Sequence, residues 1–324
     1  MALISHKLIG VTPSFPPAVN KHGDVMSEKS LRKVRQRSIH IAASVFLFPS
    51  LLLLAVFVVY PIIDSFSISL VQWNGISTVR KPVGLDNWKV LVGDPSFWAA
   101  FRNNLIVMFI SLATQGVLAI SLATFLDIVG RKGVVFKVIW FLPYLISSVA
   151  IGILFKFALD ANFGIFASIS KFFGGGTVDL LGRPERALLA VMGVVSWQYT
   201  PFYMILYLAA YGTIPVELYE AAAIDGATRG QYFWKISLPL LRPTIVSGAT
   251  VSIIGSLKYF DLVYVMTGGG PGVATELMAT MMYKTSFVKQ NFGYGAAVAG
   301  GMFILITLVA LLVVFTLNRK AAEA

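Results

Sequence analysis

Polar and aromatic side chains that could bind a small ligand interrupt two long apolar stretches of the chain. A polar group inside such a stretch needs a partner or a water-filled cavity, so each is a candidate contact. Sugars are bound by aromatic rings that stack on C–H faces and by side chains that hydrogen-bond hydroxyl groups. The predicted substrate-binding set has that character: Gln198, Tyr199 and Phe202 in 187–212, and Gly255, Ser256, Lys258 and Tyr259 in 240–266. Alternatively, these Ser and Gln side chains hydrogen-bond neighbouring helices.

Lys258 is the most unusual of these residues, because a lysine in an apolar span costs roughly 3 kcal/mol unless it is paired or hydrated. It can neutralise Asp261, three residues further on. It can instead meet an anionic ligand, such as an acidic oligosaccharide. The sequence leaves both interpretations open.

The chain lacks the groupings that catalysis or metal binding requires. It has no cysteine, and its three histidines all lie within the first 40 residues. The stretch TGGGPG (267–272) lacks the G-x-x-x-x-G-K-[ST] pattern of a nucleotide-binding loop. We therefore predict no catalytic residue, no metal site and no cofactor in this chain, and we interpret 267–272 as a flexible outer loop.

The elements that must position these residues are membrane-spanning helices. Of 324 residues, 57% are hydrophobic and 13% are charged, against about 25% charged in soluble domains. The net charge of +11 comes from basic residues that flank apolar runs, so nucleic acid is not a predicted partner. A helix crosses the hydrocarbon core with about 20 apolar residues. Six stretches qualify, and they predict an all-α membrane protein with six transmembrane helices: 39–63, 103–127, 134–159, 187–212, 240–266 and 294–318.

Basic residues set the predicted orientation, because Lys and Arg flanking a span stay in the cytoplasm. They gather at 29–37, at Arg131 and Lys132, and at 319–320, which places both termini in the cytoplasm. The domain organisation follows. Residues 1–38 form a cytoplasmic tail with a short basic helix, residues 39–318 form the six-helix domain with a cytoplasmic loop at 213–239, and residues 319–324 form a cytoplasmic C-terminus.

The loop 213–239 has the pattern of two short helices joined by a tight turn. The alanines at 221–223 favour a helix, and Asp225-Gly226 predicts its end, because Gly readily adopts the left-handed conformation. Thr228 and Gln231 have the spacing of a capping box for the second helix. Propensity alone would describe an ordinary connecting loop.

The spacing of the loop resembles a family motif. Glu220-Ala221-Ala222, followed by Gly226, Ile236 and Leu238-Pro239, is similar to the EAA loop of ABC-importer permeases. The stretches at 48–74, 83–105 and 260–276 resemble the sugar-specific branch of that family, the MalF-type and glycerol-phosphate-type permeases. Residues 1–27 alone lie outside the resemblance.

The resemblance implies a type I ABC-importer permease in the bacterial inner membrane that imports a sugar or oligosaccharide by alternating access. Its implied partners are a second homologous permease subunit, two ATPase subunits that bind ATP and Mg²⁺, an extracytoplasmic solute-binding protein and membrane lipid. The loop would dock on an ATPase subunit, so the implied coupling residues are Glu220, Ala221, Ala222, Asp225 and Gly226. The resemblance leaves two sugar classes open, a neutral sugar and an acidic one such as the uronates of alginate. It assigns ATP hydrolysis to the partner subunits.

Three other functions are weighed against this one. A permease for a small anionic solute such as glycerol phosphate would use the same architecture. A secondary transporter usually shows internal repeats and buried ion-binding carboxylates, and the sequence shows no visible repeat. A membrane enzyme would need clustered catalytic residues inside the spans.

Overall fold

The computed structural model describes residues 44–322, of which the side chains are described as far as 316. The predicted tail and basic helix at 1–38, the start of the first predicted span and the last two residues lie outside the described range. Contacts between residues divide the chain into two units, one that ends at Ile63 and one that begins at Asp64. In the first part, residues 44–63 belong to one apolar helix whose side chains are all exposed. That helix contains η1 (Ala55–Val59) and continues into α2 (Tyr60–Ile68).

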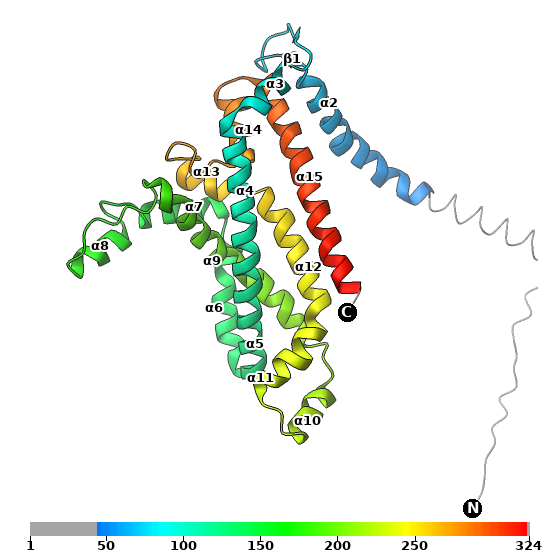
Figure 1. Ribbon diagram of the computed structural model, residues 1–324, viewed down its shortest axis with the longest axis vertical. Coiled ribbons are helices and arrows are strands. Elements are labelled where there is room, and N and C mark those ends of the chain that lie inside the picture. The colour runs from blue at the N-terminus through cyan, green and yellow to red at the C-terminus, as the bar shows by residue number, and fades with distance from the viewer. Residues whose placement is uncertain (1–43, 323–324) are drawn as a thin grey trace, which may run out of the picture. The chain divides into compact units, whose positions relative to one another are not determined.

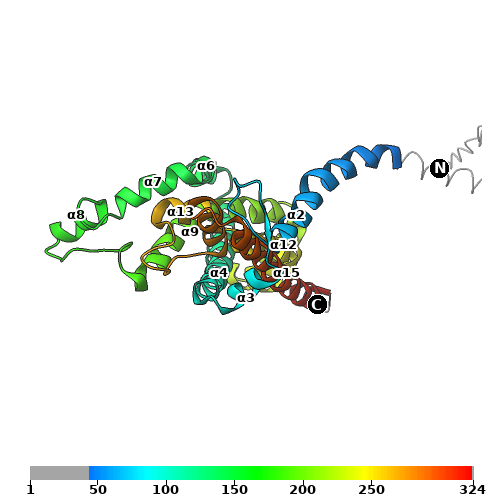
Figure 2. The ribbon, with the colours of Figure 1, turned by 90° about the horizontal axis from the view of Figure 1, so that it is seen from above.

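The second part is a helical bundle with a small β-hairpin at one end (Figures 1 and 2). The strands pair antiparallel, with Val71 opposite Pro82. The elements in chain order are β1 (Val71–Gln72), β2 (Lys81–Pro82), α3 (Asp86–Gly93), α4 (Pro95–Ala113), η2 (Thr114–Leu118), α5 (Ala119–Val129), η3 (Gly130–Gly133), α6 (Val134–Leu145), α7 (Ser148–Ala158), α8 (Ile165–Phe172), α9 (Pro184–Tyr211), α10 (Val216–Ile224), α11 (Arg229–Tyr232), η4 (Phe233–Ser237), α12 (Leu238–Leu257), α13 (Asp261–Thr267), α14 (Met278–Tyr283), η5 (Lys284–Val288) and α15 (Phe292–Ala322).

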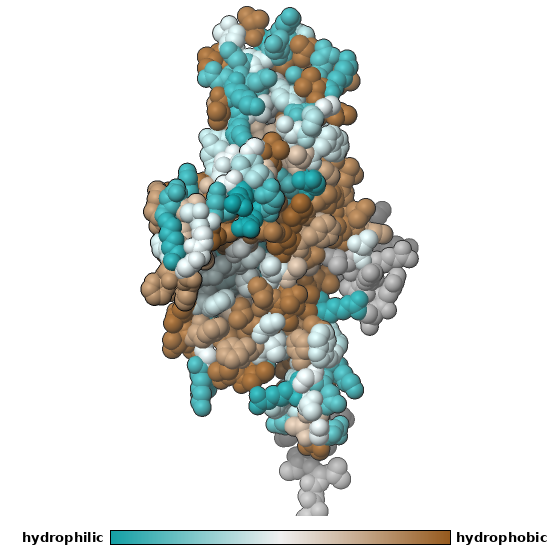
Figure 3. All heavy atoms as spheres, turned by 60° about the vertical axis from the view of Figure 1, so that its left-hand side comes forward, coloured by the Kyte–Doolittle hydropathy of each residue, from teal (hydrophilic) through white to brown (hydrophobic). Residues whose placement is uncertain are grey.

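Five helical stretches of the described chain are long and apolar enough to cross a membrane. They are Ser44–Ile68, Pro95–Leu145, Pro184–Tyr211, Arg229–Leu257 and Phe292–Thr316. The second stretch reverses direction at η3, where Gly130 has a φ of 59°. Across this turn the rings of Phe125 and Phe136 contact each other, with centroids 5.5 Å apart. On the face shown in Figure 3, a hydrophobic band lies between more hydrophilic ends, as a membrane protein requires.

Two predicted spans are not continuous helices, which corrects the prediction from hydropathy. The span predicted at 134–159 divides into α6 and α7, because Pro143 lies near the end of α6 and Ile146 is extended. The span predicted at 240–266 ends as α12 at Leu257 and resumes as α13 at Asp261. The buried Asn104 side chain donates a hydrogen bond to the Leu257 carbonyl (3.1 Å), which satisfies one of the free carbonyls at this helix end.

The long helix α9 forms much of the core of the bundle. One hydrophobic cluster joins it to α4, α7 and α13 around Met192 and Val195, and another joins it to α5 and α12 around Met204 and Tyr207. A third cluster packs α12 against α4, α14 and α15. The two breaks therefore lie on helices that pack beside α9.

Candidate functional site

A cavity of about 430 Å³ opens where the two broken helices meet α9. Its walls come from η2, α6, α7, α9, α12 and α13, so residues up to 146 positions apart in the sequence line one space. The lining residues are Gln115, Tyr144, Ser148, Tyr199, Phe202, Tyr203, Val251, Ser252, Gly255, Ser256, Lys258, Tyr259, Phe260 and Asp261.

Aromatic rings form one continuous wall of this central cavity. Tyr144 stacks on Phe202 with ring centroids 5.3 Å apart. Tyr199 meets Tyr259 edge to face at 5.5 Å, and Tyr144 meets Tyr199 edge to face at 6.0 Å. Each ring is therefore held by its neighbours, and the wall is pre-formed for stacking against a flat apolar ligand face.

Hydrogen-bonding groups complete the cavity. Gln115 accepts a hydrogen bond from the Ser252 hydroxyl at 2.7 Å in a buried position. The hydroxyls of Ser148 and Tyr199 are 3.0 Å apart and also form a hydrogen bond. A mostly aromatic cavity with a few fixed polar groups is typical of a site for a small organic ligand.

Lys258 and Asp261 lie at the break between α12 and α13 and both line the cavity. Lys258 is the C-terminal cap of α12, and Asp261 opens α13. Within the described part of the chain, no salt bridge of 4 Å or less joins these two side chains. The geometry thus presents a cation and an anion to the cavity as separate groups.

The structure brings together six of the seven residues predicted to bind substrate: Tyr199, Phe202, Gly255, Ser256, Lys258 and Tyr259. Gln198 lies behind the wall, buried at 2% exposure. Its amide donates to the Ile146 carbonyl and to the Ser148 hydroxyl, both at 3.2 Å. Gln198 therefore ties α9 to the break between α6 and α7 and positions Ser148, which does line the cavity.

The predicted substrate-binding set lacks seven polar or aromatic lining residues: Gln115, Tyr144, Ser148, Tyr203, Ser252, Phe260 and Asp261. Two signals could have found some of them. Gln115 is an amide inside an apolar span, and Pro143 with Ser147-Ser148 marks a break in the span at 134–159. Tyr203 gave no such signal, since tyrosine is common in buried helices.

A second candidate site is the loop that connects α9 to α12, at the end of the bundle opposite the β-hairpin (Figure 1). The two predicted helices are present as α10 and α11. The turn after α10 is a Schellman motif, in which the Ala227 and Gly226 amides donate to the carbonyls of Ala222 (2.9 Å) and Ala223 (3.1 Å). Gly226 has a φ of 72°, and Thr228 with Gln231 forms the predicted capping box.

The predicted coupling residues divide between two faces of α10. Glu220, Ala221, Asp225 and Gly226 are exposed, whereas Ala222 is 8% exposed and faces inward. Sequence reasoning missed Ile224, which is 86% exposed on the outer side of the helix.

The loop that begins with TGGGPG is hydrogen-bonded to the bundle, a set of contacts that the sequence interpretation did not include. Asn103 donates hydrogen bonds to three of its carbonyls, those of Val273, Ala274 and Glu276 (3.0–3.2 Å). Glu276, with a 5% exposed side chain, forms a salt bridge with Lys284. Burial of an ion pair and a shared amide donor fix this loop on α4 and η5. In residues 44–322, no three His, Cys, Asp or Glu side chains gather as metal ligands.

Comparison with known proteins agrees with this architecture. Residues 115–322 match the family described as binding-protein-dependent transport system inner membrane component. The chain is 31% identical over 271 residues to the multiple sugar-binding transport system permease protein MsmF of Streptococcus mutans, covering 82% of this chain and 92% of that one. It is 30% identical over 258 residues to the trehalose/maltose transport system permease protein MalF of Thermococcus litoralis, covering 80% and 87%.

A solved structure has the same fold. It is described as a bacterial alginate ABC transporter in complex with an alginate pentasaccharide-bound periplasmic protein. One of its chains is 25% identical to this chain, with a TM-score of 0.75. The match covers 90% of this chain and 96% of that one. The family match spans well over half of the sequence and includes the central cavity and the loop with α10. The chain therefore belongs to the family of binding-protein-dependent transport system inner membrane components, the permease subunits of ABC transporters.

Proposed function

We propose that the chain is one half of the translocation path of a sugar or oligosaccharide importer in a bacterial inner membrane. A second, homologous permease would supply the other half. A solute-binding protein would deliver the sugar, and two ATPase subunits would bind ATP and Mg²⁺ and drive the cycle. The observation that carries the proposal is the central cavity, where four tyrosines and two phenylalanines surround hydrogen-bonding groups.

The proposed membrane arrangement has six spans and cytoplasmic termini. Hydropathy supplies the span count, and the basic turn at η3 lies at the same end of the bundle as α10 (Figure 1). Arg131 and Lys132 in that turn are exposed. Basic residues at this end favour a cytoplasmic location for both features, which would put α10 within reach of an ATPase subunit.

In this proposal α10 transmits movement of the ATPase to the bundle. Glu220 and Ala221 on its outer face, with the exposed Ile224, would enter a groove of the ATPase. Its inner face packs through Ala222 and the aromatic side chain of Tyr219, whose ring contacts Tyr232 at 5.3 Å. A rigid-body shift of α10 would therefore pull on α11 and on the continuous helix that leads to the cavity residue Ser256.

The sugar is proposed to stack on the aromatic wall and to hydrogen-bond the hydroxyl and amide groups. Lys258 would contact a carboxylate if the sugar is acidic, and the absence of a salt bridge to Asp261 favours this role over a purely structural pair. The same observation favours a second candidate, a small anionic solute such as glycerol phosphate. Alginate is the ligand in the related solved structure, which supports the acidic oligosaccharide.

Replacing Lys258 with Met tests the ligand class. We expect assembly with the partner subunits to be preserved, and uptake of an acidic oligosaccharide such as alginate trisaccharide to be lost in proteoliposomes. Lys156→Met is the matched control, because Lys156 is an exposed lysine in α7 that does not line the cavity. Unchanged transport kinetics in the Lys258 variant would refute an ionic role for this residue, and uptake of glycerol phosphate in place of the oligosaccharide would select the second candidate.

A further inference from the structure

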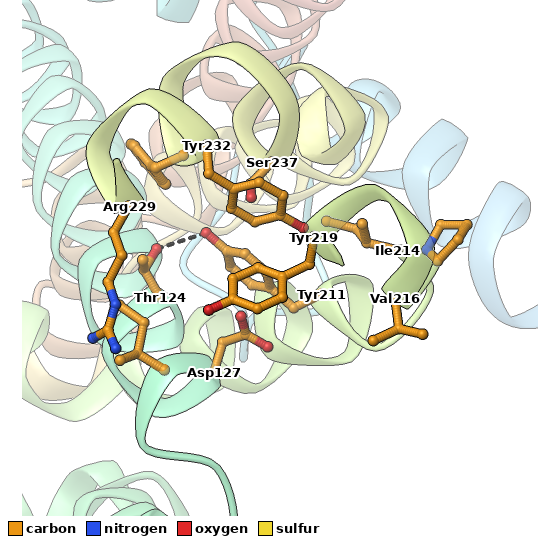
Figure 4. A pocket seen from close by; sticks show the side chains of 12 residues that line it. Thr124, Asp127, Tyr211, Ile214, Val216, Tyr219, Arg229, Tyr232 and Ser237 are labelled. Carbon is orange, nitrogen blue, oxygen red and sulfur yellow. Dashed lines mark hydrogen bonds between the residues drawn. The ribbon is translucent and has the colours of Figure 1, made fainter. Parts of the chain in front are cut away.

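A second cavity lies behind α10, between this helix and the bundle (Figure 4). Its volume is about 410 Å³, at the lower end of the roughly 300–1,000 Å³ of small-molecule sites. Four parts of the chain form its walls: the end of α5, the end of α9, the inner face of α10, and α11 with η4. Its polar and aromatic lining residues are Thr124, Asp127, Tyr211, Tyr219, Arg229, Tyr232, Phe233 and Ser237.

The cavity is lined with hydroxyl groups mounted on aromatic rings. The Tyr211 ring is buried, and its hydroxyl lies 2.7 Å from the Thr124 hydroxyl. The rings of Tyr219 and Tyr232 meet edge to face at 5.3 Å. Figure 4 shows the three tyrosines grouped around the centre of the cavity. Apolar ring faces beside fixed hydroxyls suit a ligand that has both C–H faces and hydroxyl groups.

Two opposite charges border the same space without neutralising each other. Asp127 projects from α5 toward the tyrosines, whereas Arg229 extends from the first turn of α11 along the edge of the cavity, with its guanidinium directed away from the tyrosine rings (Figure 4). Among the described residues, neither side chain takes part in a salt bridge of 4 Å or less. One carboxylate and one guanidinium give the cavity no net charge, and together they offer strong acceptors and donors. A neutral ligand with many hydrogen-bonding groups fits this arrangement better than an anion or a cation.

The cavity lies where a ligand would affect coupling. Val216 and Tyr219 on α10 line it, while Glu220 and Ile224 of the same helix are exposed. A ligand held between Asp127 on α5 and Tyr219 on α10 would fasten α10 to the bundle. Because α10 is the element proposed to follow the ATPase, such a ligand would restrain its movement.

We infer that this cavity binds a neutral mono- or disaccharide from the cytoplasm and that the bound sugar slows transport. The cytoplasmic location and the inhibitory effect rest on the proposed function, whereas the ligand class rests on the cavity alone. Asp127 and Arg229 would hydrogen-bond the sugar hydroxyls, and the tyrosine rings would cover its C–H faces. The site is separate from the central cavity, with which it shares no lining residue.

The test is a binding titration on the complete transporter in nanodiscs, without the solute-binding protein. The probes are trehalose and glucose, with glycine betaine as a zwitterion of opposite charges but no hydroxyl groups. We expect both sugars to bind and betaine not to bind. Asp127→Asn removes the negative charge and Tyr219→Phe removes a hydroxyl group, each with little change of volume. We expect Asp127→Asn to weaken sugar binding by about tenfold, because a charged hydrogen-bond acceptor becomes a neutral one. Tyr199→Ala, in the central cavity, should leave this binding unchanged.

Three results would overturn the inference: no binding of either sugar, binding that Tyr199→Ala abolishes and Asp127→Asn preserves, or preferential binding of betaine. ATP hydrolysis stimulated by the solute-binding protein gives a second readout. Trehalose added on the ATPase side should reduce it in the unmodified transporter but not in the Asp127→Asn variant, and equal rates with and without trehalose would refute the inhibitory effect. If the proposed function were wrong, this stimulation would be absent, while the binding titration would still report on the cavity.

Discussion

Gly226 offers the sharpest test of how the loop with α10 is built. Its φ of 72° lies in the left-handed region, and a Cβ placed there would meet no atom within 4 Å. Substitution with alanine therefore causes strain in the backbone and no steric clash. An L-residue in this conformation costs roughly 1–2 kcal/mol, so the Schellman turn of the Gly226→Ala variant should open about 5–30 times more often.

Hydrogen exchange measures this opening directly. We expect the amides of α10 to exchange about 5–30-fold faster in Gly226→Ala, with no change in the cores of α9 and α12. Gly226→Asn should be milder, because Asn tolerates the left-handed conformation better than Ala. If α10 docks on an ATPase subunit as proposed, ATPase affinity should fall by no more than the same factor, since the turn would have to form first.

Gly230 provides the matched control. It lies four residues away in α11, and its Cβ position is also empty, but its φ is not positive. Gly230→Ala should therefore stabilise the loop by roughly 0.5–1 kcal/mol. Faster exchange in Gly230→Ala, or no difference between Gly226→Ala and the unmodified chain, would show that the left-handed turn does not hold α10 in place.

Three further predictions concern single interactions. Glu276→Gln removes the carboxylate partner of Lys284, and we expect the unfolding free energy in detergent to fall by about 2–3 kcal/mol. This is somewhat below the roughly 3–5 kcal/mol of a fully buried pair, because the Lys284 side chain is 29% exposed. An unchanged melting temperature would contradict this. Thr228→Ala removes the capping box and should destabilise α11 by about 1 kcal/mol. We expect faster amide hydrogen exchange in α11 alone. Unaltered exchange in α11 would argue against the cap. Burial raises the pKa of Asp94, but hydrogen bonds from the hydroxyl of Tyr294 and the amide of Ser96 outweigh it and hold the pKa below its ordinary value. This stabilisation is therefore present above about pH 4 and is lost as the pH falls through the lowered pKa. Asp94→Asn should flatten the acid limb of the melting temperature plotted against pH. Parallel profiles for the variant and the unmodified protein would refute the assignment.

Hydropathy and turn chemistry predicted much of the architecture. Apolar length identified the stretches that become α9 and α15, because a helix needs about 20 apolar residues to cross the hydrocarbon core. The capping box at Thr228 and the turn at Gly226 were also predicted correctly, since both depend on residues only a few positions apart. Local signals of this kind predict the structure correctly where tertiary packing favours the same local conformation.

The breaks in two spans could not be read from hydropathy. The end of α12 at Leu257 depends on Asn104, which lies 153 residues earlier and donates to its carbonyl. The hydrogen bonds that reach the loop beginning with TGGGPG likewise come from Asn103 and Lys284, which no local sequence pattern connects to it. The central cavity lies at the two breaks beside α9. The polar and aromatic residues of two apolar stretches, Lys258 among them, indicated part of its lining, whereas the breaks themselves were not predicted.

Transport by the purified protein in proteoliposomes tests the central claim most directly. We expect uptake of an oligosaccharide to require ATP, the solute-binding protein, the second permease and the ATPase together, and to be abolished by Glu220→Lys on the exposed face of α10. Glu185→Lys, an exposed carboxylate at the start of α9, should transport normally. Uptake by this chain alone, driven by a sodium or proton gradient and indifferent to ATP, would contradict the account.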